Sequence, residues 1–90
     1  SNIPYHIEIF DTSHFQGQAS VGSMVVWNDG FVKNKYRHYN LSSKDEYSQM
    51  RELLTKRADS FDKNPPPDLW LIDGGENQIK IAKEIIDSSG

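Results

Sequence analysis

Two aspartates each close a short segment with strand character. Asp11 follows residues 5–10, in which apolar and polar side chains alternate, as in a half-buried strand. Asp73 follows the unbroken apolar run Leu69–Ile72, which is typical of a strand covered on both faces. If these strands are neighbours, the two carboxylates come close and repel each other unless a cation lies between them. Mg²⁺ and Mn²⁺ prefer oxygen ligands, so the pair predicts a divalent metal site.

Such a site suits the chemistry of phosphodiester cleavage. Two ions about 3.5–4 Å apart can activate a water and stabilise the leaving oxygen. A simpler interpretation is that the aspartates only cap a turn or the next helix. Asp73 stands directly before Gly74-Gly75, where capping alone would explain it. From the residues by themselves, both interpretations remain open.

The segments between the aspartates predict how they are positioned. Residues 24–27 and 31–39 predict two more strands, joined by the turn Asn28-Asp29-Gly30, where Asn and Gly tolerate positive φ. Ser43 followed by Glu46 has the pattern of a capping box, and apolar residues then recur at helical spacing. A helix is therefore expected over residues 44–61. The prolines 65–67 end it, and a second helix should follow Gly75.

These elements predict an α/β fold. Three antiparallel strands come first, then a right-handed helical crossover to a fourth strand parallel to the first, then a helix. The expected sheet order is three, two, one, four, with both aspartates at the ends of neighbouring central strands. Tyr5, Ile7 and Ile9 are expected to share one face of the first strand, and the apolar face of the second helix is expected to carry Ile81, Ala82, Ile85 and Ile86. Trp27 and Trp70 are expected in the core. The charged residues Arg51, Glu52, Lys56 and Arg57 are expected to face water.

Composition sets further bounds. The chain has 90 residues, enough for one small domain, and residues 1–4 are interpreted as a leader or tag remnant. It contains no cysteine, which excludes disulfides and thiolate metal sites. No apolar run approaches the roughly 20 residues that span a membrane, and no signal peptide is evident, so a cytoplasmic location and no membrane partner are expected. The net charge of −3 argues mildly against strong nonspecific binding of nucleic acid.

The residues around the aspartates resemble a known family. Ile9–His14 is similar to the strand that opens the nuclease domain of the UvrC family. Gly17 and the run Val21–Val26 resemble the segment that follows it. Tyr36–Tyr39 and Asp45–Tyr47 resemble two later motifs of that family, and Pro67–Leu69, Leu71–Gly75 and Gln78 resemble its most distinctive one. The similarity is collinear over nearly the whole chain, which makes it specific.

This resemblance implies a ribonuclease-H-like fold and Mg²⁺- or Mn²⁺-dependent cutting of damaged DNA. In excision repair the family's domain makes the 5′ incision together with UvrB, and with UvrA through the repair complex. The family's metal ligands correspond to Asp11 and Asp73, plus a histidine on a helix that would lie beyond Gly90. The residues are therefore expected to form an N-terminal part of the endonuclease domain that is inactive by itself. Two departures from the family stand out: Glu46 replaces an aspartate, and Glu76-Asn77 replaces Lys-Gly.

Three other residues could act beside the metal site. His14 could orient a carboxylate or touch DNA, or be an ordinary surface histidine. Glu46 could approach the metals, although a capping role explains it, and Asp45 is explained by the helix dipole.

A basic stretch gives a second candidate site. Lys33, Lys35 and Arg37 alternate, so on one strand they would share a face and could contact DNA phosphates. Protection of an edge strand would explain them equally well. For the chain as a whole, the alternative to a nuclease is a noncatalytic ribonuclease-H-like module that binds DNA or protein.

Overall fold

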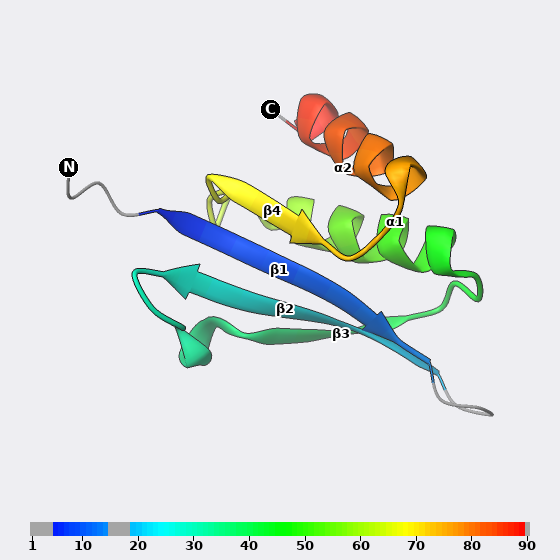
Figure 1. Ribbon diagram of the computed structural model, residues 1–90, viewed down its shortest axis with the longest axis horizontal. Helices are drawn as coiled ribbons and strands as arrows, with labels where there is room; N and C mark the ends of the chain where they lie inside the picture. Colours follow the sequence, from blue (N-terminus) through cyan, green and yellow to red (C-terminus); the bar gives the residue numbers. More distant parts are fainter. Residues whose placement is uncertain (1–4, 15–18, 90) are drawn as a thin grey trace.

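A mixed four-stranded sheet with two helices forms the domain. The computed structural model describes residues 5–14 and 19–89, so the proposed leader and Gly17 lie outside the described residues. The strands are β1 (His6–Ser13), β2 (Ser20–Asn28), β3 (Arg37–Leu41) and β4 (Leu69–Ile72). The helices are α1 (Glu46–Ala58) and α2 (Glu76–Ser89), and a short 3₁₀ helix, η1, spans Lys33–Lys35. The sheet order β3-β2-β1-β4, with β1 parallel to β4, confirms the predicted topology (Figure 1).

The core lies between the sheet and α1, and α2 packs against α1 (Figure 1). Phe10, Leu53 and Leu54 are among its most buried side chains. Gly22 of β2 allows α1 to come close, because a Cβ there would lie 2.7 Å from a methyl carbon of Leu53. In the described residues, neither helix is long and apolar enough to cross a membrane.

The core-facing side of β1 carries Glu8 and Phe10, which are buried under α1. Ile7 and Ile9 share the opposite face and are half-buried, so they share a face as predicted. Alternation fixes which residues share a face but not which face is covered.

The predicted third strand is interrupted. Asp29 and Gly30 have φ values of 56° and 135°, which confirms the predicted turn. Beyond it, Phe31 forms only an isolated bridge with Trp27, and η1 precedes β3. Lys33 and Lys35 therefore lie in a helical turn, so they do not share a strand face with Arg37. Trp27 is also not in the core: it is 36% exposed and stacks edge-on against Phe31.

The first helix starts later than predicted. Asp45, not Ser43, is the N-cap: its carboxylate accepts from the backbone N–H of Ser48 at 2.8 Å and from the Ser48 hydroxyl at 2.8 Å. Ser43 cannot form the expected box because its N–H donates instead to Glu52 at 2.9 Å. The helix ends at Ala58, before Phe61. In α2, Ile81, Ala82 and Ile85 are buried as predicted, but Ile86 is 46% exposed.

Candidate metal centre and surrounding residues

Asp11 lies within β1, and Asp73 directly follows the parallel neighbouring strand β4. The ladder between β1 and β4 pairs Ile9 with Leu71 and Phe10 with Ile72. Continuing this register by one step beyond β4 would pair Asp11, which lies within β1, with Asp73, which directly follows β4. Adjacent strands are about 4.8 Å apart, so the backbones at these two positions would be neighbours.

Side-chain alternation also puts both carboxylates on one side of the sheet. Asp11 follows Ile7 and Ile9 on the face away from α1, and Asp73 follows Leu69 and Leu71 in the same way. Both aspartates are exposed. The prediction of two central strands needs correction, because β4 is an edge strand within the described residues.

The donor set fits a hard divalent cation. It consists of carboxylate oxygens, which Mg²⁺ and Mn²⁺ prefer. One Asp11 oxygen already accepts from the backbone N–H of Thr12 at 2.9 Å, which orients the side chain. Within residues 5–14 and 19–89, no group of three or more His, Cys, Asp or Glu side chains converges. Among the described residues, Asp11 and Asp73 are thus two candidate metal ligands without a third.

The turn after Asp73 is tightly packed. Gly74 lies against the side-chain amide of Gln78, and a methyl group at Gly74 would collide with that amide. Gln78 is 6% exposed, and its Oε1 is buried without a hydrogen-bond partner in the described part of the chain. The resemblance had singled out both residues, and their contact gives a structural reason for them: together they fix the backbone that follows Asp73.

His14 is held away from the aspartates. Its Nδ1 lies 2.8 Å from the hydroxyl of Ser20, and Gln49 Nε2 donates to the same hydroxyl oxygen at 2.8 Å. The hydrogen bond of His14 among the described residues is to Ser20 and not to a carboxylate, so the expectation that it orients one gains no support. Its ring is exposed and remains available to a ligand.

Asp45 and Glu46 differ in how far local structure explains them. Asp45 is accounted for by its cap, and the donated backbone N–H and hydroxyl of Ser48 lower the pKa of its carboxyl. Glu46 is the first residue of α1, is exposed, and has no capping bond, so the explanation by a capping box was wrong. Both lie at the edge of a shallow pocket that also includes Glu76 and Gln78 at the start of α2.

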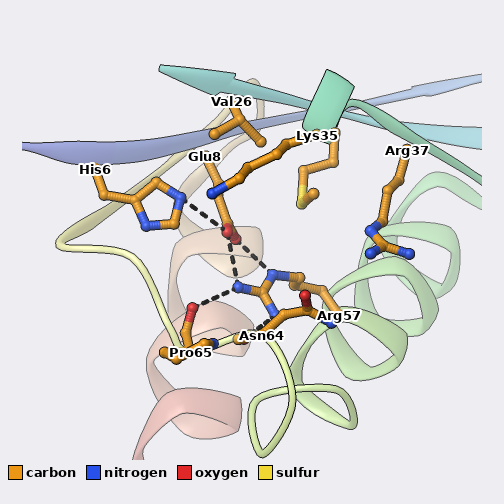
Figure 2. A pocket seen from close by; sticks show the side chains of 9 residues that line it. His6, Glu8, Val26, Lys35, Arg37, Arg57, Asn64 and Pro65 are labelled. Carbon is orange, nitrogen blue, oxygen red and sulfur yellow. Dashed lines mark hydrogen bonds and ion pairs between the residues drawn. The ribbon is translucent and has the colours of Figure 1, made fainter. Parts of the chain in front are cut away.

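A buried ion pair was not anticipated from the sequence. Arg57 donates from Nε and from an Nη to the two oxygens of Glu8, at 2.7 Å each, and both residues are 2% exposed (Figure 2). Arg57 also donates to the Ser60 hydroxyl and to the carbonyl oxygens of Asn64 and Pro65, so all five of its N–H groups are used. The prediction that Arg57 faces water was wrong.

The same carboxylate joins two further side chains. Trp70 donates its indole N–H to Glu8 at 3.0 Å, and His6 Nε2 lies 3.3 Å from the other Glu8 oxygen. Trp70 packs edge-on against Phe10, which confirms its place against the core. The sequence held a sign of this pair: Glu8 alternates with Phe10 on one face of β1, and Arg57 stands among the core positions of α1.

Two of the three predicted phosphate-binding residues line a cavity above this pair. The cavity measures about 140 Å³ and is lined by Lys35, Arg37 and His6 around Glu8 and Arg57 (Figure 2). Lys33 does not line it. Lys35 and Arg37 reach the cavity from η1 and the start of β3, and they have no ion-pair partner among the described residues. Lys35 and Arg37 thus line the same cavity because η1 directly precedes β3, and not because they alternate along one strand.

The sheet order, the parallel β1–β4 pair and the carboxylates at its end define an α/β domain of the ribonuclease-H-like class. A family model described as the UvrC RNase H endonuclease domain matches residues 1–90. The chain is 72% identical over 90 residues to the UvrABC system protein C of Nautilia profundicola, and 59% identical over 91 residues to that of Aliarcobacter butzleri. These matches cover 99% and 98% of the chain but 15% of each relative. The chain belongs to the UvrC RNase H endonuclease domain family.

Proposed function

We propose that this chain supplies two metal ligands, Asp11 and Asp73, to a divalent-metal-dependent DNA endonuclease that makes the 5′ incision in nucleotide excision repair. The observation that supports the proposal is the register of the parallel β1–β4 pair, which would set the two carboxylates opposite each other if it continued by one residue. If the two aspartates only capped turns, they would not need to be neighbours, since a cap acts within its own turn. Because the chain spans about 15% of its relatives' length, the activity belongs to a longer protein.

The roles of the residues follow from their positions. Asp11 and Asp73 would hold Mg²⁺ or Mn²⁺, together with a histidine outside residues 1–90. The bound ion would supply Lewis-acid activation of the attacking water and neutralise charge on the phosphate. The Thr12 N–H and the Gly74–Gln78 contact would keep the two carboxylates in place. Glu46, free of a capping role, is an outer carboxylate candidate.

The proposed partners follow from the family. The substrate would be damaged DNA, and the relatives' name, UvrABC system protein C, supports action with UvrA and UvrB. A protein that cuts chromosomal DNA in bacteria would work in the cytoplasm. Lys35 and Arg37 would contact phosphates, and such contacts would make DNA binding weaken as salt rises.

The metal site can be tested with the chain by itself. Mn²⁺ is titrated into the ¹⁵N-labelled chain, and paramagnetic broadening of backbone amides is recorded. We expect broadening centred on residues 11–12 and 73–74 that disappears in Asp11→Asn and in Asp73→Asn. Asp62→Asn, which changes an exposed aspartate after α1, is the matched control and should bind as the unchanged chain does.

Two results would separate the nuclease from a noncatalytic binding module. In the longer protein, Asp11→Asn and Asp73→Asn should each abolish the 5′ incision while leaving damaged-DNA binding intact. Incision that survives both substitutions would refute the proposed roles. Absence of Mn²⁺ binding in both the short chain and the longer protein would favour the binding module.

A further inference from the structure

A chain of hydrogen bonds links three elements at the end of the sheet that carries Asp11. His14 directly follows β1, Ser20 begins β2, and Gln49 lies in α1. Ser20 and Gln49 are 3% and 4% exposed, whereas His14 is exposed. A solvent-facing imidazole is thus held from behind by two buried polar side chains. This arrangement differs from that of an ordinary surface histidine, whose ring has no fixed orientation.

The direction of these hydrogen bonds can be assigned. Gln49 Nε2 lies 2.8 Å from Ser20 Oγ and 3.2 Å from the carbonyl oxygens of both Ser43 and Lys44. Carbonyl oxygens can only accept, so the atom facing them is the amide nitrogen. Ser20 Oγ therefore accepts from Gln49, and its own hydrogen can be donated to His14 Nδ1, 2.8 Å away. A neutral imidazole that accepts at Nδ1 carries its proton on Nε2.

The His14 ring lines a pocket whose charge favours an anion. The pocket measures about 430 Å³, and His14 and Lys44 are the titratable residues among those that line it. Among the described residues no carboxylate lines it, and the nearby Glu52 is already engaged: it accepts the N–H groups of Ser42 and Ser43 at 3.0 and 2.9 Å. Lys56 lies 3.2 Å from Glu52 and offsets its charge. The Nε2–H of His14 and the ammonium group of Lys44 are therefore the donors that could bind an anion most strongly.

We propose that His14 and Lys44 bind a non-scissile phosphate of the DNA strand, and that Ser20 and Gln49 fix the His14 tautomer that donates to it. This rests on the proposed function for the identity of the ligand. His14 lies three residues beyond Asp11, about 10 Å along the chain, but its ring is on the α1 side of the sheet, so the phosphate would lie at the same end of the sheet as Asp11 and on the other face. His14 is here a positioning residue: it holds the strand and takes no part in the reacting bonds.

The tautomer can be read directly. Long-range ¹H–¹⁵N correlation spectra of the chain above the pKa of a free histidine should show His14 protonated at Nε2. Ser20→Ala removes the hydroxyl donor and should shift His14 toward a mixture of both tautomers. His14 protonated mainly at Nδ1 in the unchanged chain would overturn the proposal.

Phosphate binding is tested with inorganic phosphate and then a thymidine trinucleotide, both in EDTA. We expect both to shift the His14 ring and Lys44 Nζ resonances. His14→Gln places an amide nitrogen near the Nε2 position and should weaken binding less than about threefold, whereas His14→Asn places it near Nδ1 and should weaken binding about tenfold. His38→Asn, at an exposed histidine of β3, is the control and should change nothing.

The outcomes separate this proposal from the metal site. Equal binding by His14→Asn and the unchanged chain, or shifts confined to residues outside the pocket, would overturn it. Mn²⁺ binding at Asp11 and Asp73 is measured independently, so either site can fail without the other. A trinucleotide that binds no differently from inorganic phosphate would reject a DNA strand as the ligand.

Discussion

Replacing Arg57 with methionine should severely destabilise the domain. The substitution keeps an unbranched side chain but removes five donated hydrogen bonds and leaves the Glu8 carboxylate, 2% exposed, without its counterion. Breaking a buried ion pair from one side costs about 3–5 kcal/mol. A 90-residue domain has a total stability on the order of 5–13 kcal/mol, so much of it would be lost.

Urea unfolding followed by circular dichroism measures this loss. With a urea dependence of about 1–3 kcal/mol per molar, the midpoint should fall by about 2 M. Arg51→Met is the matched control: Arg51 pairs with Glu84 at 2.7 Å, but the two side chains are 45% and 65% exposed, and its midpoint should not move measurably. If Arg57→Met lowered the midpoint no more than Arg51→Met, the reasoning about burial would be refuted.

A double substitution separates the ion pair from the other contacts. Glu8→Met combined with Arg57→Met removes both charges, so most of the loss should be recovered. Recovery should be incomplete, because the indole N–H of Trp70 then lacks its acceptor, which costs about 1–3 kcal/mol. A double variant no more stable than Arg57→Met would show that the unpaired Glu8 charge is not the source of the damage.

Three further predictions follow from local geometry. Asp45→Ala should lower the urea midpoint because the Ser48 N–H loses its acceptor, whereas Ser43→Ala should not; the reverse order would restore Ser43 as the cap. Gly22→Ala should lower the free energy of unfolding by about 1–3 kcal/mol, since the new Cβ would lie 2.7 Å from Leu53. When Leu53→Ala is combined with it, the further loss of stability should be smaller than the loss from Leu53→Ala alone; additive losses would argue against the contact. Burial opposes ionisation of Glu52, but the Ser43 and Ser42 N–H groups and Lys56 outweigh it and lower the pKa of Glu52 to about 2. Because the pKa of Glu52 is lowered in the folded state, its ionised form stabilises the fold above the ordinary value of 4.5, and this stability is lost as the pH falls toward 2. Glu52→Gln should therefore reduce the change in urea midpoint across that pH range. A pH dependence equal to that of the unchanged chain would count against this assignment.

The sequence predicted the order of elements and the pairing of strands well, because these depend on strong local signals. The turn at Asp29-Gly30, the prolines after α1 and the apolar run of β4 each depend on neighbouring residues alone. The register that would set Asp11 opposite Asp73 then follows from a parallel crossover between two short strands. The proposed pairing of the two aspartates rests on this crossover and stays a prediction.

What could not be predicted depends on contacts between distant residues. Arg57 looks like a solvent-facing helix residue until Glu8, 49 positions earlier, is placed beneath it. Ser43 was the predicted N-cap and Asp45 is the observed one, because the Ser43 N–H donates to Glu52, further along the chain in α1. The 3₁₀ turn at Lys33–Lys35 interrupts the strand that was predicted over residues 31–39.

The buried Glu8–Arg57 pair also bears on how β1 is aligned. Ile7, Ile9 and Phe10 give this strand apolar residues of both parities, so hydrophobicity alone would tolerate a shift of one residue. A shift of that size turns every side chain to the opposite face. Such a shift would separate Glu8 from Arg57 and leave the buried Arg57 charge unpaired. It would also turn Asp11 into the core. We therefore expect the ion pair to fix the alignment of the strand: the buried charge of Glu8 on one face determines that the Asp11 carboxylate lies on the other.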